Sequence, residues 1–229
     1  MRKQQLRAAG LEYLELQPDV PGGELPLIVG LHGRGASGED LVGLASWLNP
    51  ETYRFALPNG PIPVENAPWE AGHAWYVIGQ EQDATIERSR DLILRLVDEL
   101  ERRYATSRQR MALVGFSQGA VLVLDVGLRS PEPFGGLVAM SGYLYAPETF
   151  GPALRAGHDR RVLLIHGSYD EVMTVDGARL ARDVLEAAGL QPEYHELPIG
   201  HQVSPDSLAL VRGFLERVLR PTQQEVSRS

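Results

Sequence analysis

Cysteine is absent from this chain of 229 residues. Its absence excludes disulfides, thiolate catalysis and cysteine-based zinc sites, and it is consistent with a reducing cytoplasm. Long apolar runs are also missing: none approaches the ~20 residues of a membrane-spanning helix, and the first six residues lack the apolar core of a signal peptide. The net charge of −8 disfavours a nucleic-acid partner. We therefore expect a soluble, cytoplasmic protein that binds no nucleic acid and does not span a membrane.

The rest of the composition is that of an ordinary globular protein, with 43% hydrophobic and 23% charged residues. Short apolar runs alternate with stretches of helical periodicity, which predicts an α/β fold: a mostly parallel sheet with helices on both faces. We expect a single domain over residues 1–229, with a frayed tail at 221–229. The expected strands are 11–16, 27–31, 53–57, 111–116, 137–140, 162–165 and 193–197. The expected helices are 38–48, 84–104, 120–128, 175–188 and one that begins at Pro205.

The pentapeptide Gly115-Phe116-Ser117-Gln118-Gly119 directly follows one of these apolar runs and precedes an amphipathic stretch. Strand, tight turn and helix are the context in which the pattern G-x-S-x-G forms a nucleophile elbow. There the serine lies on a strained turn that exposes its hydroxyl, and the glycines let neighbouring backbone approach. Ser117 is therefore the candidate nucleophile. The alternative is a serine that caps an ordinary helix.

A serine hydroxyl needs a base to take its proton and an acid to orient that base. In this architecture both follow the serine in the chain and lie just beyond later strands, where the strand carboxyl ends share one edge. Asp170 follows the expected strand 162–165, and His201 follows the last expected strand. We assign Asp170 as the acid and His201 as the base. Glu171 and Asp176 are alternative acids, and a plain turn residue is the other interpretation of Asp170.

An oxyanion hole requires two backbone N–H groups that point at the developing negative charge. One is expected from Gln118, at the start of the helix after the nucleophile, where the helix dipole adds a favourable field. The second is expected from Arg34, because Leu31-His32-Gly33-Arg34-Gly35 follows the expected strand 27–31 and is similar to an HGGG-type loop. A plain glycine turn is the alternative interpretation of this loop.

The remaining histidines are not expected to be catalytic. His32 and His166 are expected to be structural, His195 falls inside an expected strand, and His73 and His158 fall in irregular stretches where surface positions are expected. No cluster has metal-ligand spacing, and no glycine-rich loop carries a following lysine for phosphate. We therefore expect neither a metal nor a cofactor.

Two long irregular stretches, 58–80 and 141–159, are rich in aromatic residues. Connections of this length are usually functional in compact domains. Trp69, Trp75 and Tyr76 in the first stretch are the candidate substrate-binding residues, because their rings could line an apolar pocket. The alternative is that these aromatic side chains pack onto the edge of the sheet.

Taken together, the motifs resemble the α/β-hydrolase fold and, more narrowly, the phospholipase/carboxylesterase family that includes acyl-protein thioesterases. The matching segments run in family order from about residue 25 to 201: Leu31-His32-Gly33-x-Gly35, Pro58-Asn59-Gly60-Pro61, Ala74-Trp75-Tyr76, Gly115-Phe116-Ser117-Gln118-Gly119, His166-Gly167-x-x-Asp170-x-Val172 and Gly200-His201. Val77 departs from the family, which usually has an aspartate there, and so does Val172-Met173-Thr174, where Val-Val-Pro is common. The resemblance implies an α/β-hydrolase fold without a large cap domain.

The same resemblance implies a serine hydrolase that cleaves carboxylic esters or thioesters of small to medium acyl groups, with Ser117, Asp170 and His201 as triad. An acyltransferase or a peptidase with the same triad is one alternative. A non-catalytic binding protein on a hydrolase scaffold is another. The expected partner is a small-molecule substrate, and a homodimer is possible because an exposed apolar rim could serve dimerisation as readily as lipid-like substrates.

Overall fold

The computed structural model describes residues 1–19, 25–49, 51–64, 72–150 and 160–219. Trp69, His158 and the tail 221–229, which carry expectations from the sequence, lie outside these residues. Within the described ranges, no helix combines the length and the apolar character needed to cross a membrane.

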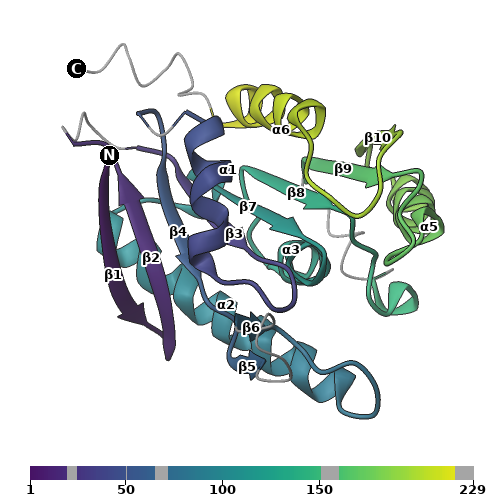
Figure 1. Ribbon diagram of the computed structural model, residues 1–229, viewed down its shortest axis with the longest axis horizontal. Helices are drawn as coiled ribbons and strands as arrows, with labels where there is room; N and C mark the ends of the chain where they lie inside the picture. The colour runs from purple at the N-terminus through teal and green to yellow at the C-terminus, as the bar shows by residue number, and fades with distance from the viewer. Residues whose placement is uncertain (20–24, 50, 65–71, 151–159, 220–229) are drawn as a thin grey trace.

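An eight-stranded sheet runs through the described part of the chain, in the order β1-β2-β4-β3-β7-β8-β9-β10 (Figure 1). The strands from β4 to β10 in this order are parallel, whereas β2 is antiparallel to both of its neighbours. The bounds are β1 (Arg2–Ala8), β2 (Leu11–Gln17), β3 (Leu27–Leu31), β4 (Arg54–Pro58), β7 (Met111–Phe116), β8 (Gly136–Met140), β9 (Val162–Gly167) and β10 (Glu193–Leu197). The predicted mostly parallel sheet is thus confirmed.

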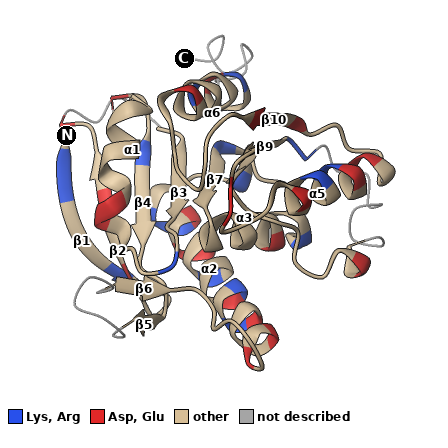
Figure 2. Ribbon diagram, turned by 45° about the vertical axis from the view of Figure 1, so that its right-hand side comes forward, with Lys and Arg blue, Asp and Glu red and all other residues tan. Residues whose placement is uncertain are grey.

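Helices cover both faces of this sheet, as predicted (Figure 1). The helices α2 (Gln82–Tyr104), α3 (Gln118–Arg129) and α5 (Val175–Ala187) contribute to one buried apolar cluster, and α1 (Val42–Trp47) and α6 (Pro205–Val218) contribute to a second. Strand residues alternate between the two clusters: Val29 packs in the first and Ile28 in the second. The charged residues of α2 and α5 lie along the outside of the molecule (Figure 2). Short 3₁₀ turns occur at η1 (Gly38–Leu41), η2 (Arg108–Arg110) and η3 (Pro147–Thr149).

The predicted positions of the helices and of the strands of the main sheet hold closely, with two differences. The expected helix 38–48 is a 3₁₀ turn followed by the short α1. The expected opening strand is the second arm of a hairpin, because β1 precedes it and was missed. The residues of β1 are mostly polar and exposed, so no apolar alternation marks the strand in the sequence. The hairpin turn Ala9-Gly10 has φ values of 51° and 85°, as a tight two-residue hairpin connection requires.

The helix predicted after Ser117 is present as α3, but it lacks the exposed polar face of an amphipathic helix. Every residue of α3 from Gln118 to Leu128 is buried, because the helix is packed between the sheet and α2. The buried carboxylate of Asp125 accepts hydrogen bonds from Nε of Arg90 at 2.6 Å and from Nε of Arg129 at 2.8 Å. The one acidic side chain on α3 is therefore paired rather than solvated.

The first irregular stretch contains a small hairpin. Its strands β5 (Ile62–Val64) and β6 (Gly72–Ala74) are antiparallel and lie outside the main sheet. His73 joins this hairpin to the loop after β3, because its N–H donates to the Ala36 carbonyl at 2.8 Å and its carbonyl accepts from the Gly35 N–H at 2.8 Å. The hairpin is thereby fixed beside the edge where the parallel strands end.

Candidate active site

Ser117 lies in the tight turn between β7 and α3, with φ 56° and ψ −122°. This backbone conformation is unfavourable for a residue with a side chain. A Cβ atom added to Gly115 would lie 2.4 Å from the carbonyl carbon of Gly119, and one added to Gly119 would lie 2.0 Å from the carbonyl oxygen of Leu31. The pentapeptide therefore folds as the sequence predicts, with glycines where backbone passes close to backbone. The Ser117 side chain makes no capping hydrogen bond to α3.

The Ser117 hydroxyl donates instead to Nε2 of His201, at 3.0 Å. Nδ1 of the same ring donates to Oδ2 of Asp170 at 2.7 Å. This pattern assigns the proton of the neutral imidazole to Nδ1 and leaves Nε2 as the acceptor. Ser117 and His201 are 84 residues apart along the chain, and Asp170 and His201 are 31 residues apart. The structure brings the three side chains together.

Backbone hydrogen bonds hold together the loops that carry Asp170 and His201. The Ser168 N–H donates to the Leu197 carbonyl at 2.8 Å, and the Tyr169 N–H donates to the Ile199 carbonyl at 3.0 Å. These bonds continue the parallel pairing of β9 and β10 beyond the ends of both strands. As a result, the two loops leave the same edge of the sheet side by side.

The Asp170 carboxylate is fully buried and well supplied with donors. Its Oδ1 accepts hydrogen bonds from the N–H groups of Val172 at 3.0 Å and Met173 at 2.8 Å. Burial acts to raise the pKa of Asp170, but the bonds from Met173 and His201 outweigh burial and lower the pKa below its ordinary value. The side chain is therefore ionised at neutral pH.

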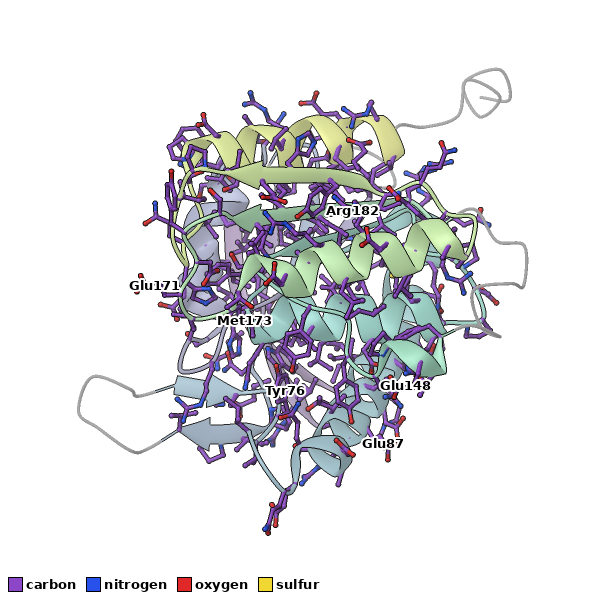
Figure 3. The ribbon with its side chains drawn as sticks, turned by 90° about the vertical axis from the view of Figure 1, so that its right-hand side faces the viewer. Tyr76, Glu87, Glu148, Glu171, Met173 and Arg182 are labelled. Atoms are coloured by element: carbon purple, nitrogen blue, oxygen red, sulfur yellow. The ribbon has the colours of Figure 1, made fainter. Side chains whose placement is uncertain are left out.

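The alternative acids lie elsewhere. Glu171 is exposed and lies at the outer edge of the molecule in the view of Figure 3. Asp176 is exposed at the start of α5 and pairs with Arg179 at 3.1 Å. His166, expected to be structural, is buried, and its Nε2 donates to the Met173 carbonyl at 2.7 Å. His195 falls inside β10 as expected.

The loop after β3 runs directly against the serine turn. A Cβ atom added to Gly33 would lie 3.4 Å from the Cβ of Ser117. Buried His32 stabilises this loop: Nδ1 donates to the Gly33 carbonyl at 2.7 Å, and Nε2 accepts from the Gly60 N–H at 3.0 Å. Burial lowers the pKa of His32 from 6.5 to about 4, so the ring stays neutral in this structural role. Among the described residues, no protein acceptor pairs with the N–H groups of Arg34 or Gln118.

Comparisons with known proteins identify the family. The sequence model of the phospholipase/carboxylesterase family matches residues 22–219. The chain belongs to this family. An acyl-protein thioesterase 1 homolog from Dictyostelium discoideum is 29% identical over 82% of this chain and 88% of its own length.

Solved structures give the same result for the fold. The crystal structure of esterase PE8 superposes with a TM-score of 0.80 and 31% identity, covering 90% of this chain and 97% of that one. A carboxylesterase from Mesorhizobium loti has a TM-score of 0.76 at 21% identity, covering 93% and 98%, and shows the fold alone. The chain therefore has the α/β-hydrolase fold without a large cap domain, and it is a hydrolase that acts on ester bonds.

In this hydrolase the side chain of Gln118 has a structural role that the sequence did not indicate. Its Oε1 accepts from the Trp75 N–H at 3.1 Å, and its Nε2 donates to the Tyr76 carbonyl at 3.0 Å. The glutamine thereby ties the residues after β6 to the serine turn. Nothing in the local pattern indicates this role, because the contacts join segments more than 40 residues apart.

Trp75 and Tyr76, the described candidates for substrate contact, are both buried. The Trp75 ring is fully buried and its Nε1 donates to the His32 carbonyl at 2.9 Å. Trp75 packs in the first buried apolar cluster, and we do not retain it as a substrate contact. Tyr76 lies beneath α3 and beside the β5–β6 hairpin (Figure 3). Burial, together with the nearby Tyr143 hydroxyl, raises the pKa of Tyr76 above its ordinary value.

Tyr76 does line a cleft of about 520 Å³. The other described lining residues come from the β3 loop, the β5–β6 hairpin and the segment after it: Arg34, Ile62, Pro63, Val64, Ala74, Val77 and Ile78. Val77 and Ile78 are 38% and 72% exposed at the rim. Within the described ranges, no group of three or more histidine or acidic side chains could hold a metal ion.

Proposed function

We propose that the chain is a serine esterase in which Ser117, His201 and Asp170 form the catalytic triad. One observation carries the proposal: hydrogen bonds of 3.0 and 2.7 Å connect the Ser117 hydroxyl through the His201 ring to the Asp170 carboxylate. The strained backbone of Ser117 supports the same role, because such conformations persist where the surrounding structure enforces them.

In the first half-reaction Ser117 Oγ attacks the ester carbonyl, and Nε2 of His201 takes the hydroxyl proton. Asp170 stabilises the imidazolium that forms and keeps the ring in the required orientation, while remaining ionised itself. The imidazolium then protonates the leaving alcohol or thiol, and an acyl-enzyme is left on Ser117. In the second half-reaction His201 takes a proton from water as the water attacks the acyl group. The bond to Ser117 Oγ then breaks, the imidazolium returns its proton to Oγ, and the acid is released.

The carbonyl oxygen becomes an anion in both half-reactions, and we assign its stabilisation to the N–H groups of Arg34 and Gln118. Gln118 is the first residue of α3, so its N–H has no intrahelical acceptor. The proximity of Gly33 to Ser117 supports the assignment of the second donor to the next residue, Arg34. Removing one such donor typically costs about 10²–10³ in turnover.

The proposed substrates are carboxylic esters or thioesters with small to medium acyl groups. The cleft beside Arg34 is of a size that fits such a group. Thioesters are included because two relatives are named acyl-protein thioesterase, the one from Dictyostelium discoideum and one from Gibberella zeae.

A fluorophosphonate probe tests the proposal, because it reacts with activated serines. The wild type and the variant Ser141→Ala should be labelled, whereas Ser117→Ala should not. Ser141 is a matched control since it is also buried and also has a positive φ, of 52°. Equal labelling of Ser117→Ala and wild type would remove Ser117 from the role. A chain-length series of nitrophenyl esters and acyl-thioesters would define the acyl preference, and ligand binding without any turnover would favour a binding protein.

A further inference from the structure

The cleft beside the serine turn has one charged residue among its described lining residues, Arg34. The other described lining residues have uncharged side chains. The strands β5 and β6 contribute no charged residue to this wall, and they are drawn entirely in the neutral colour in Figure 2. Arg34 therefore supplies the only positive charge among the described residues of this wall.

The cleft is next to the nucleophile. Arg34 directly follows Gly33, whose added Cβ would lie 3.4 Å from the Cβ of Ser117. Tyr76, another lining residue, accepts a hydrogen bond at its carbonyl from the Gln118 side chain. Arg34 and Tyr76, which line the cleft, are therefore both connected to the turn that carries Ser117.

The Arg34 guanidinium is also unpaired among the described residues. It is exposed and makes no ion pair or hydrogen bond with the described part of the chain. Many other arginines of this acidic protein pair with carboxylates, for example Arg90 with Asp125 and Arg217 with Glu193. A free guanidinium offers a planar set of donors that matches a carboxylate or a phosphate.

We propose that Arg34 makes the enzyme selective for ester or thioester substrates that carry an anionic group. The anion would be joined to the scissile carbonyl by a short apolar chain that occupies the cleft. This inference rests on the proposed function, because it takes Ser117 as the nucleophile. It adds a substrate class that the triad alone does not specify.

The length of the connecting chain follows from the arginine itself. If the Arg34 N–H holds the carbonyl oxygen, its guanidinium lies within roughly 6–7 Å of that backbone, given bonds of about 1.5 Å. A chain of a few methylene groups covers this span. The acyl group of a medium-length dicarboxylic acid monoester fits the requirement, and so does an alcohol with a nearby carboxylate.

The experiment compares kcat/KM for substrates that differ only in charge. In the acyl arm, the 4-nitrophenyl monoester of adipic acid is compared with 4-nitrophenyl hexanoate. In the alcohol arm, the hexanoyl ester of 4-hydroxybenzoate is compared with that of 4-hydroxybenzamide. Spontaneous hydrolysis is subtracted for each ester. The wild type should prefer the anionic substrate in one arm by about ten-fold or more, because a hydrogen bond to a charged group contributes about 1.5–3 kcal/mol.

Three variants identify the residue responsible for the preference. Arg34→Gln should reduce the ratio of anionic to neutral turnover to near one, and Arg34→Glu should reverse it. Both variants keep the backbone N–H. Arg212→Gln should retain the wild-type ratio; Arg212 is an exposed arginine on α6, which lies at the opposite end of the molecule from β5 and β6 (Figure 1). Added salt should lower the wild-type preference, a test that needs no variant.

The outcomes separate the inference from the proposed function. Hydrolysis of the neutral esters without an anionic preference in either arm would overturn the inference and leave the triad intact. A preference that persists in Arg34→Gln would also overturn it. Absence of both ester turnover and fluorophosphonate labelling in the wild type would refute the proposed function itself.

Discussion

The backbone strain at Ser117 makes a prediction about stability that is independent of substrate. Replacing Ser117 by alanine keeps a Cβ atom in the conformation with φ 56° and ψ −122°, whereas replacement by glycine removes that atom. Both variants lose the hydrogen bond to His201, so this loss cancels when they are compared. The glycine variant is therefore expected to be the more stable of the two.

The size of the difference can be worked out from three contributions. A non-glycine residue in such a region costs about 1–3 kcal/mol. Glycine offsets part of this gain, because its extra freedom in the unfolded chain costs about 0.5–1 kcal/mol and the lost methyl group costs up to about 0.8 kcal/mol of burial. The balance favours Ser117→Gly over Ser117→Ala by about 1 kcal/mol. That difference raises the melting temperature by about 2–4 °C for a chain of this size.

Equilibrium urea unfolding and thermal melts of both variants measure this difference. A matched pair at Ser46, an exposed residue of α1 with ordinary helical geometry, supplies the control. There Ser46→Gly should be less stable than Ser46→Ala by about 0.5–1 kcal/mol, the opposite sign. If Ser117→Ala were as stable as Ser117→Gly, or more so, the serine turn would hold no strain and the argument would be wrong.

Three further predictions concern single residues of the site. Asp170→Asn should lower kcat by about 10⁴ in steady-state assays with little change in KM; a loss below ten-fold would contradict the triad. The pKa of His32 is 6.5 in the unfolded chain and about 4 in the folded one, so acid favours the unfolded chain. The contribution of the neutral ring to stability is complete above pH 6.5 and amounts to about 3 kcal/mol. It is lost as the pH falls to about 4. Urea titrations over this range should show a smaller pH dependence in His32→Gln, and equal slopes would contradict the burial argument. Gly119→Ala should unfold the protein or destabilise it by several kcal/mol, because the added Cβ would lie 2.0 Å from the Leu31 carbonyl oxygen. The control is Gly213→Ala inside α6, where the nearest atom to an added Cβ is 3.5 Å away. Calorimetry should show this control to be neutral or stabilising.

The convergence of Ser117, Asp170 and His201 could be predicted because chain order and strand position suffice for it. Asp170 and His201 each follow a predicted strand, and parallel strands end at one edge. The sequence therefore places both beside Ser117 without any knowledge of packing.

Long-range contacts could not be predicted in this way. The hydrogen bond between His32 and Gly60 joins segments that share no local pattern, and so do the two hydrogen bonds of the Gln118 side chain. The burial of Trp75 belongs to the same class, since an aromatic residue in an irregular stretch can face a pocket or the core. The strand β1 was missed for a different reason: it lies at the sheet edge and is mostly polar.

The burial of α3 on all sides has a consequence for the order in which the molecule opens. Amide protons of this helix can exchange with solvent only when the layers around it separate, so they should be among the slowest to exchange in the chain. Ser117 directly precedes the first residue of that slow unit, whereas much of the cleft wall belongs to a two-stranded hairpin at the periphery. Changes in substrate range can therefore accumulate in the hairpin while the serine turn keeps its geometry.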